Sequence, residues 1–474
     1  MGVSGQSIVI GAGPNGLAAA ITLAQAGQRV TVYEASPTIG GGSRTAELTL
    51  PGFRHDVCST IQALAPSSPF LSTLGLERFG LEWVRPDVPL AHPLDDGSAV
   101  LLLRSVEETA AQFARADADA YRRLVGPLAA RTDQLWEAFL GPLPGALRHP
   151  LLAARFGARA LWPAPTLARA RFQGEPARAL IAGNAAHSIL DLREPGTSAM
   201  ALMLMVAAHA DGWPFARGGS QALVDAMAAL FASLGGEIIT GHAVRSLAEL
   251  PPDATVLFDL TPRQIVAIAG DALPDRYRRQ LGRFRYGAAA FKLDWALDGP
   301  IPWAAPTVHR AGTVHLGGSL AGIVTSEAAV ASGGVTDRPF VLLTQPSLFD
   351  PTRAPADRHT AWAYCHLPAG SVVDMTDRIE AQVERFAPGF RKRIIGRSIM
   401  RPADFARYNE NYVDGDINGG RQDLRQQFTR PVPRLAPYRT PNPRLFIGSA
   451  STPPGGGIHG MAGFHGARAA LKRR

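Results

Sequence analysis

The sequence predicts an α/β protein in which a Rossmann-like nucleotide-binding domain is assembled from separated segments beside a second, α+β domain. Three observations predict this fold class. Residues 7–34 have the pattern strand, glycine turn, helix, strand, which is the βαβ unit that binds dinucleotides. A similar alternation of short strands and helices returns near residues 237–259 and again near 444–471. Between these two regions, runs such as 291–297 alternate between apolar and polar residues, which is typical of a strand in another sheet.

The glycine turn of the βαβ unit has the spacing that a dinucleotide requires. Gly11 allows the tight turn, Gly13 lets the backbone approach a pyrophosphate, and Gly16 lets the helix pack closely on the strand. The following helix offers free N–H groups and a partial positive charge to the phosphates. Glu34 ends the second strand, where it can accept hydrogen bonds from ribose hydroxyls and would repel a 2′-phosphate. The alternative is a glycine turn that only allows the helix to pack on the strand. The acid at the distance expected for a dinucleotide site argues against this alternative.

Two further glycine-rich stretches follow. Residues 39–45 form the first, whose glycines allow close backbone approach. The fixed charge of Arg44 in this loop can pair with a diphosphate or with a carboxylate. Residues 453–457 form the second, just before a final predicted helix that starts near Met461.

Composition limits the size of the protein and its partners. The chain has 474 residues, of which 46% are hydrophobic, and this suffices for two or three domains. The net charge of +8 fits nucleic acid, an anionic membrane, an anionic cofactor or an arginine-rich proteome. Because no basic run carries interleaved aromatic residues, we expect no nucleic-acid partner. The composition does not indicate which oligomeric state the protein adopts.

Cysteine usage and hydropathy predict a cytoplasmic protein. Cys58 and Cys365 lie far apart, so the sequence has no disulfide framework and no C-x-x-C pair, which suits a reducing compartment. The N-terminal apolar run lacks the basic region of a signal peptide. The best candidate for a membrane span, residues 198–210, is too short.

Residues 138–174 contain no acidic residue, and several arginines lie there among Leu, Phe, Trp and Pro. This combination is similar to a segment that meets a membrane surface, and it predicts peripheral membrane association. An ordinary helical cap with snorkelling arginine stems explains the same pattern, and we favour this second interpretation.

Several separated stretches together resemble the FAD-dependent oxidoreductases of the phytoene desaturase (carotenoid desaturase) family, including its pyridine nucleotide-disulphide oxidoreductase domain 2-like branch. The resemblance covers essentially the whole chain, and its last stretch is the most specific to the family. Its carriers are residues 11–16 with Glu34, residues 39–45, residues 217–220 with Val244, and residues 445–461. FAD is therefore the expected cofactor.

The resemblance also implies which residues contact FAD. In this family the C-terminal glycine loop and the next helix N-terminus lie beside the isoalloxazine and the diphosphate, where backbone N–H groups stabilise negative charge. Val244 would hold the adenine through backbone groups, although plain strand packing also explains it. The expected FAD contacts are Gly11, Gly13, Pro14, Asn15, Gly16, Glu34, Ala35, Gly41, Gly42, Ser43, Arg44, Val244, Gly448, Ser449, Gly457, Ile458, His459 and Met461.

Two domains follow from this interpretation, a Rossmann-like FAD-binding domain and an α+β substrate domain. The FAD-binding domain comprises residues 1–75, 215–280 and 426–474. The substrate domain comprises residues 76–214, which form a helical cap, and residues 281–425, which contribute a mixed sheet.

Few side chains are candidates for acid–base chemistry. His459 lies in the expected flavin-proximal loop, and Tyr412 and Asn418 lie in a polar, glycine-bearing loop before it, so these three are the candidate catalytic residues. Capping and turn chemistry would also explain them. Five further residues could line a cavity or pack as ordinary core residues: His187, Trp213, His315, Tyr364 and His366. No spacing of histidine or cysteine predicts a metal site.

The resemblance implies an FAD-dependent desaturase or dehydrogenase that passes a hydride from an apolar, polyene-like substrate to flavin N5. The sequence holds a single dinucleotide fingerprint, so we expect no second NAD(P) domain, and oxygen, a quinone or another acceptor would reoxidise the flavin. No catalytic side chain can be matched in the substrate half, so the substrate does not carry over. An amine oxidase-like flavoenzyme, a redox-neutral isomerase and a low-turnover flavin-bearing binding or assembly protein are the alternatives.

Overall fold

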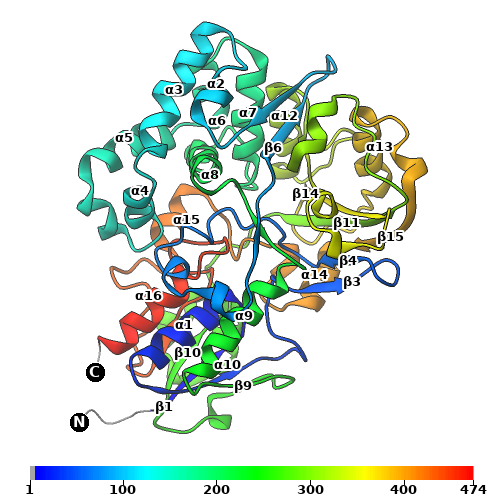
Figure 1. The fold of residues 1–474 in the computed structure, drawn as a ribbon. Coiled ribbons are helices and arrows are strands. Elements are labelled where there is room, and N and C mark those ends of the chain that lie inside the picture. Colours follow the sequence, from blue (N-terminus) through cyan, green and yellow to red (C-terminus); the bar gives the residue numbers. More distant parts are fainter. Residues whose placement is uncertain (1–5, 473–474) are drawn as a thin grey trace.

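The computed structural model describes residues 6–472 and contains two large β-sheets (Figure 1). The first sheet has the strand order β16-β10-β1-β2-β9, and every neighbouring pair is parallel. Its strands are β1 (Gln6–Ile10), β2 (Arg29–Tyr33), β9 (Glu237–Ile239), β10 (Thr255–Phe258) and β16 (Leu445–Ile447). Segments from the beginning, middle and end of the chain therefore build one sheet, which confirms the predicted α/β fold class.

Helices cover both faces of the parallel sheet. Helices α1 (Pro14–Gln25), α9 (Gln221–Ser233) and α16 (Met461–Leu471) share a hydrophobic core with Val9 and Leu257. On the opposite face, α10 (Pro262–Ala269) and α11 (Asp275–Leu281) share a second core with Ile8 and Phe258. Alternate residues of β1 and β10 point to opposite sides of the sheet, which explains this division.

The packing of α1 depends on two glycines. A Cβ on Gly16 would lie 1.9 Å from the carbonyl oxygen of Gly11, so a side chain at this position would collide with the turn. A Cβ on Gly463 in α16 would lie 1.8 Å from the carbonyl oxygen of Asn15. Glycine at these two positions allows α1 to touch both the turn and α16.

The second sheet has seven strands in the order β15-β11-β14-β13-β12-β6-β7. It is mixed, because β6 runs parallel to β12 whereas the other neighbouring pairs are antiparallel. Its strands are β6 (Val88–Pro93), β7 (Ala99–Leu102), β11 (Ala289–Leu297), β12 (Ala311–Leu316), β13 (Val341–Thr344), β14 (His359–Leu367) and β15 (Ile394–Met400). Two short antiparallel pairs are β3 (Thr45–Glu47) with β4 (Arg54–Asp56), and β5 (Trp83–Val84) with β8 (Phe215–Ala216).

All nine residues of β11 are buried, although their chemistry alternates. Phe291, Leu293 and Trp295 join an apolar core that includes residues of α13 (Thr376–Phe386). Lys292 and Asp294 point to the opposite face of the sheet, where they are also buried. This polar face is covered because it turns toward the N-terminal segment and the cavity described below.

In Figure 1 a cap of helices, in cyan to green, lies above the parallel sheet and beside the second sheet. Its helices are α2 (Val106–Ala110), α3 (Arg115–Ala129), α4 (Thr132–Phe139), α5 (Pro150–Ala160), α6 (Ala164–Arg171), α7 (Glu175–Ala186) and α8 (Thr197–Asp211). The other α-helices are α12 (Leu320–Ala331), α14 (Pro402–Tyr408) and α15 (Leu424–Thr429). Within residues 6–472, no helix is both long enough and apolar enough to cross a membrane.

Single 3₁₀ turns connect many of these elements. They are η1 (Leu71–Thr73), η2 (Leu76–Phe79), η3 (Leu143–Arg148), η4 (Leu247–Glu249), η5 (Gly270–Ala272), η6 (Pro306–Arg310), η7 (Pro346–Leu348), η8 (Pro351–Arg353), η9 (Phe390–Arg393) and η10 (Val413–Gly415).

Candidate functional site

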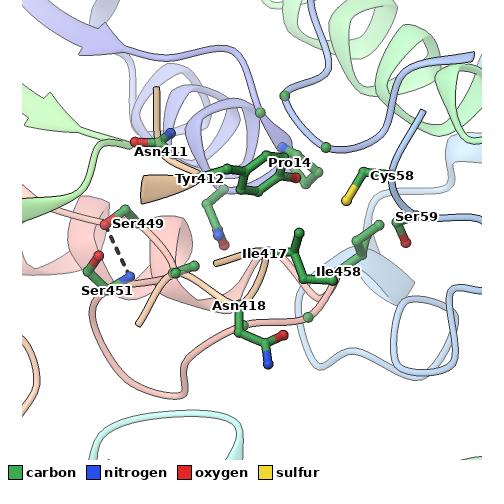
Figure 2. A pocket seen from close by; sticks show the side chains of 18 of the residues that line it. Pro14, Cys58, Ser59, Asn411, Tyr412, Ile417, Asn418, Ser449, Ser451 and Ile458 are labelled. Carbon is green, nitrogen blue, oxygen red and sulfur yellow. Dashed lines mark hydrogen bonds between the residues drawn. The ribbon is translucent and has the colours of Figure 1, made fainter. Parts of the chain in front are cut away.

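A large cavity of about 1140 Å³ extends from the glycine turn to the helical cap and the second sheet. Residues from all three segments of the parallel-sheet region contribute to its wall. Figure 2 shows one part of it, where Pro14 after the turn, Cys58, Tyr412 and Ile458 gather around the same space. The cavity therefore joins the expected dinucleotide site to an apolar compartment.

Most of the residues proposed from sequence line this cavity. Lining residues are Gly11, Gly13, Pro14, Asn15, Glu34, Ala35, Gly41, Gly42, Ser43, Arg44, Tyr412, Asn418, Val244, Ser449, Gly457, Ile458 and His459. Gly16, Gly448 and Met461 do not line it. Gly448 packs against Leu257 and the backbone of α16, and Met461 is buried at the start of that helix. These three residues therefore lie behind the cavity wall and do not border the cavity itself.

Glu34 is held in place by three donors. Its Oε2 accepts a hydrogen bond from the N–H of Ala12 at 2.8 Å, and its Oε1 accepts from the N–H of Ser36 at 2.9 Å. Arg44 Nη2 donates to the same Oε1 at 3.2 Å and also to the carbonyl of Thr38 at 2.8 Å. Of the two partners that the sequence allowed for Arg44, the structure shows the carboxylate. The pair is mostly buried, so Arg44 positions Glu34 toward the cavity.

Asp259 is a residue of this site that sequence reasoning missed. It follows β10, and its Oδ2 accepts a hydrogen bond from the N–H of Gly16 at 2.8 Å. Burial raises the pKa of this carboxyl well above its usual value, and the negative charge of Glu34 raises it further. The available signal was an acid at the carboxyl end of a predicted strand, since that edge of a parallel sheet is where ligands bind.

The residues around the turn fit a dinucleotide. A Cβ on Gly13 would lie 2.9 Å from Asp259 Oδ2, and a Cβ on Gly41 would lie 3.1 Å from Gly13 Cα, so the two glycine loops are in close contact. The N-terminus of α1 opens on the cavity at Pro14 and Asn15, where free N–H groups favour a phosphate. Glu34 offers a carboxylate to ribose hydroxyls from the end of β2.

Tyr412 and Tyr408 pack the polar loop onto the second glycine loop. Their rings stack with centroids 6.4 Å apart, and the Tyr408 hydroxyl donates to the carbonyl of Gly41 at 2.7 Å. A Cβ on Gly42 would lie 2.1 Å from the Tyr412 hydroxyl. Burial raises the pKa of Tyr412 well above its usual value, and the neighbouring Cys58 thiol contributes. Tyr412 is therefore a neutral hydroxyl that positions the loop.

Asn418 and His459 belong to two turns in contact with each other. A Cβ on Gly456 would lie 2.7 Å from the carbonyl oxygen of Asn418, whose N–H donates to Asp416 Oδ1 at 2.8 Å. The Asn418 side chain points away from Tyr412 in Figure 2. His459 Nδ1 accepts from the N–H of Met461 at 3.1 Å, and burial lowers the pKa of His459 to about 4. His459 is thus a neutral ring that accepts a hydrogen bond from the first residue of α16, whose N-cap is Gly460.

The second sheet presents a polar face to the cavity. Thr313, Leu342, Thr344, Trp362 and Tyr364 line it. Behind Trp362, the ammonium of Lys292 lies 5.0 Å from the ring centroid and 2.5 Å from both oxygens of Asp294. Burial raises the pKa of Asp294 to about 6, against the opposing effect of Lys292.

The cap supplies an apolar wall on the other side. Its lining residues include Phe139, Leu140, Phe156, Ala160, Leu161, Ala199, Met200, Met203 and Leu204. Leu161 and Phe428 line the cavity and are also more than half exposed, so they mark its mouth. Among the described residues, no cluster of three or more histidine, cysteine or acidic side chains could hold a metal ion.

Comparison with known proteins agrees with this geometry. Residues 9–72 match the family described as NAD(P)-binding Rossmann-like domain. The chain is 28% identical to rat (Rattus norvegicus) pyridine nucleotide-disulfide oxidoreductase domain-containing protein 2, over 96% of this chain and 91% of that protein. It is 26% identical to the lycopene-forming phytoene desaturase of Pseudescherichia vulneris, over 98% of each.

Solved structures share the fold. An oxidoreductase from Methanosarcina mazei superposes with a TM-score of 0.66 at 16% identity, covering 98% of this chain and 100% of that one. Putrescine oxidase bound to putrescine gives a TM-score of 0.62 at 17% identity, covering 99% of each chain.

These matches define the chain as an oxidoreductase with a Rossmann-like dinucleotide-binding domain; it is related in sequence to a desaturase and shares only its fold with an amine oxidase. More particularly, it is homologous over nearly its whole length to pyridine nucleotide-disulfide oxidoreductase domain-containing protein 2 and, more distantly, to phytoene desaturase. The resemblance identified from the sequence motifs is confirmed.

Proposed function

We propose that this chain is an FAD-dependent desaturase or dehydrogenase that takes a hydride from an apolar substrate. One observation carries the proposal: the dinucleotide site and the apolar compartment under the cap form one continuous cavity. A substrate held against the cap would therefore meet the cofactor without leaving the protein.

The turn at Gly11–Gly16 and the N-terminus of α1 would hold the diphosphate, Glu34 the ribose, and backbone groups of Val244 the adenine. The C-terminal segment from Ser449 to Ile458 would lie beside the flavin ring. When bound, FAD supplies the hydride acceptor at N5. A single dinucleotide fingerprint supports reoxidation by oxygen, a quinone or another acceptor rather than by NAD(P).

The chain's own residues bind, orient and exclude water. The apolar residues of α5 and α8 cover the substrate compartment, which removes water from the region where a hydride would move. Asp416 accepts from the N–H groups of Gly287 and Gly420 at 2.8 and 2.7 Å, and so ties the polar loop to the second sheet. The loop that carries Ile417 and Asn418 is thereby fixed at the cavity wall.

An amine oxidase-like activity is the second candidate, favoured by the fold shared with putrescine oxidase and by two aromatic rings at the cavity. Trp362 and Tyr364 stack with centroids 5.8 Å apart. However, the ammonium of Lys292 already lies 5.0 Å from the Trp362 ring and pairs with Asp294. A second cation at this ring would be repelled, so an uncharged substrate is the better match.

The test is anaerobic titration of FAD-loaded protein, followed through the loss of flavin absorbance. Apolar alkenes and alcohols should bleach the flavin, whereas primary amines should not. Bleaching by amines alone would contradict the proposal and favour the amine oxidase-like activity. A flavoprotein that no substrate reduces, yet that shifts a double bond once its flavin is chemically reduced, would be an isomerase, and one that does neither would be a binding protein.

Cofactor placement has its own test. Gly13→Glu would put bulk and negative charge at the expected diphosphate position, so the purified variant should lack FAD. Gly334→Glu, at an exposed position remote from the cavity, is the matched control and should retain it. Stoichiometric FAD in Gly13→Glu would refute the placement.

We also propose that the face around the cavity mouth contacts an anionic membrane. Leu147 and Leu151 on the cap are 79% and 87% exposed, and Leu161 and Trp162 are partly exposed nearby in the same basic stretch, residues 138–174. Exposed apolar side chains among arginines suit an anionic bilayer surface. The double variant Leu147→Ser/Leu151→Ser should float less with anionic liposomes than wild type, whereas Val372→Ser, at another exposed apolar position, should float equally. Wild-type protein that never floats would remove the proposal.

A further inference from the structure

A group of buried polar side chains lies where the cavity meets α7 and the second sheet. His187 follows α7, lines the cavity and is partly exposed to it, while His315 on β12 is fully buried. Their Nε2 atoms lie 2.9 Å apart, so the two rings share a hydrogen bond. Trp213 lies beside His187, with ring centroids 6.0 Å apart.

The carbonyl of Gly318 determines which nitrogen of His92, on β6, carries the proton. A carbonyl only accepts, so His92 Nε2–H donates to it at 2.8 Å, and His92 Nδ1 is an acceptor. A Cβ on Gly183 would lie 3.1 Å from this Nδ1 and 2.7 Å from Nδ1 of His315, so both atoms face the same gap. Neither has a hydrogen-bond partner in the part of the chain that the structure describes.

If the His315 proton lies on Nδ1, this N–H faces the acceptor Nδ1 of His92. The gap between the two rings then needs no further group. His315 Nε2 then accepts from the Nε2–H of His187, and His187 Nδ1 is left as an acceptor. Burial lowers the pKa of His187 to about 3 and that of His92 to about 4, and it holds the pKa of His315 well below its usual value. All three rings are therefore neutral near pH 7.

Gln62 adds an unpaired amide to the same region. It is 1% exposed and lines the cavity, yet across residues 6–472 neither its Nε2 nor its Oε1 finds a partner. Its backbone N–H donates to the carbonyl of Pro214 at 2.9 Å, so Gln62 and His187 adjoin the same segment around Trp213. Ser188 also lines the cavity with a buried hydroxyl that lacks a partner among the described residues.

A hydrocarbon ligand would leave these groups unsatisfied. Leaving a buried polar group unpaired is unfavourable, and a site built to bond a hydroxyl rejects the analogue that lacks one. Met200, Met203 and Leu204 line the same cavity, and Trp213 Nε1 donates to the carbonyl of Leu204 at 2.9 Å, so this apolar wall adjoins the segment that contacts His187 and would hold the hydrocarbon part of a ligand.

We propose that this group binds a hydroxyl of the substrate, and that the substrate is an apolar alcohol rather than a pure hydrocarbon. The inference rests on the proposed function and names its substrate class. A hydroxyl donates to Nδ1 of His187 and accepts from the amide of Gln62, which neither an alkane nor an ether can do. His187 and Gln62 are then the residues that determine specificity.

The test is displacement of a fluorescent apolar dye from the FAD-loaded protein by dodecanol, dodecyl methyl ether and dodecane. Dodecanol should bind roughly tenfold more tightly than the ether, which can accept but not donate, and more tightly still than dodecane; tenfold is the factor expected for one hydrogen bond. His187→Leu should abolish this preference while dodecane still binds. Gln62→Leu is the second variant; it removes an unpaired amide without breaking a protein hydrogen bond of that side chain, so it should fold and also weaken the preference.

His309→Leu, a partly buried histidine on η6 that does not line the cavity, is the matched control and should behave as wild type. Equal affinity of all three probes, or an ether that binds as tightly as the alcohol, would overturn the inference. Dye displacement does not require turnover, so protein that retains FAD but shows no alcohol preference refutes this inference alone. Protein that takes up no FAD refutes the proposed function, whatever the dye reports.

Discussion

Asp259 accepts a hydrogen bond from the backbone N–H of Gly16 at 2.8 Å, although 243 positions separate the two residues. The bond places a buried carboxyl against the first turn of α1, where an incoming diphosphate is expected. Gly16 lies in α1, which follows β1, and Asp259 directly follows β10; β1 and β10 are parallel neighbours, so their carboxyl ends meet at this point.

Asp259→Asn should therefore flatten the pH dependence of stability. The pKa of Asp259 is raised in the folded protein, so its stabilising contribution is present below about pH 4 and is lost as the pH rises toward the folded pKa. The loss can reach about 1.4 kcal/mol per pH unit between the unfolded and folded pKa values. Urea unfolding at several pH values measures it, with the exposed Asp253→Asn as control. Equal slopes for wild type and Asp259→Asn would contradict the prediction.

Gly463→Ala should destabilise the protein by about 3 kcal/mol, because the new Cβ would lie 1.8 Å from the carbonyl oxygen of Asn15 and α16 would have to move off α1. FAD content of the purified variant should fall with it, since α16 follows the C-terminal loop of the site. Chemical denaturation and flavin absorbance measure the two effects. At exposed Gly334, where a Cβ meets nothing closer than 3.5 Å, the same substitution should leave both unchanged.

Arg44→Met should destabilise the fold by about 3 kcal/mol, because it leaves the mostly buried carboxylate of Glu34 without its cation. The double variant Arg44→Met/Glu34→Gln should be less destabilised than the sum of the two single variants. Arg122→Met removes an exposed partner of Glu107 and should leave stability almost unchanged, because water screens the pair. Strict additivity at Arg44 and Glu34 would show that the two residues do not interact.

Lys292→Met should destabilise the protein more at pH 8 than at pH 5. The pKa of Asp294 is about 6 in the folded protein because burial raises it, and removing Lys292 takes away the charge that opposes this rise. A raised folded pKa means that stability is lost as the pH increases through it, and the variant extends that loss to higher pH. Urea unfolding at the two pH values measures the difference. Adding Asp294→Asn should restore most of the stability at pH 8. If the double variant is no more stable than Lys292→Met, the unpaired carboxylate of Asp294 is not the cause of the loss.

Local spacing accounts for what could be predicted. The turn at Gly11, Gly13 and Gly16 and the acid Glu34 were identifiable because a tight turn, a close approach and a strand end each constrain one residue type at a set distance along the chain. Arg44 was recognised as a charge needing an anionic partner, but its partner could not be chosen. A diphosphate and a carboxylate both satisfied the pattern, and the carboxylate of Glu34 was not distinguished from any other.

Asp259, Gly463 and the His187–His315 pair carry no such local pattern. Each gains its role from a neighbour that is distant in sequence: Asp259 from Gly16, Gly463 from Asn15, and His187 from His315. Strand order and burial decide these contacts, and burial also moves the pKa values of the acids and histidines.

The sequence by itself therefore determined the nucleotide-binding unit, the α/β class and the relation to flavin-type oxidoreductases, because these depend on backbone conformation over short stretches. Only the tertiary structure decided that the glycine turn, the C-terminal loop and the apolar cap share one cavity, and that His187, whose pKa is lowered by burial, lines it. The order β16-β10-β1 brings the two ends of the chain together, and burial then sets the chemistry of the side chains between them.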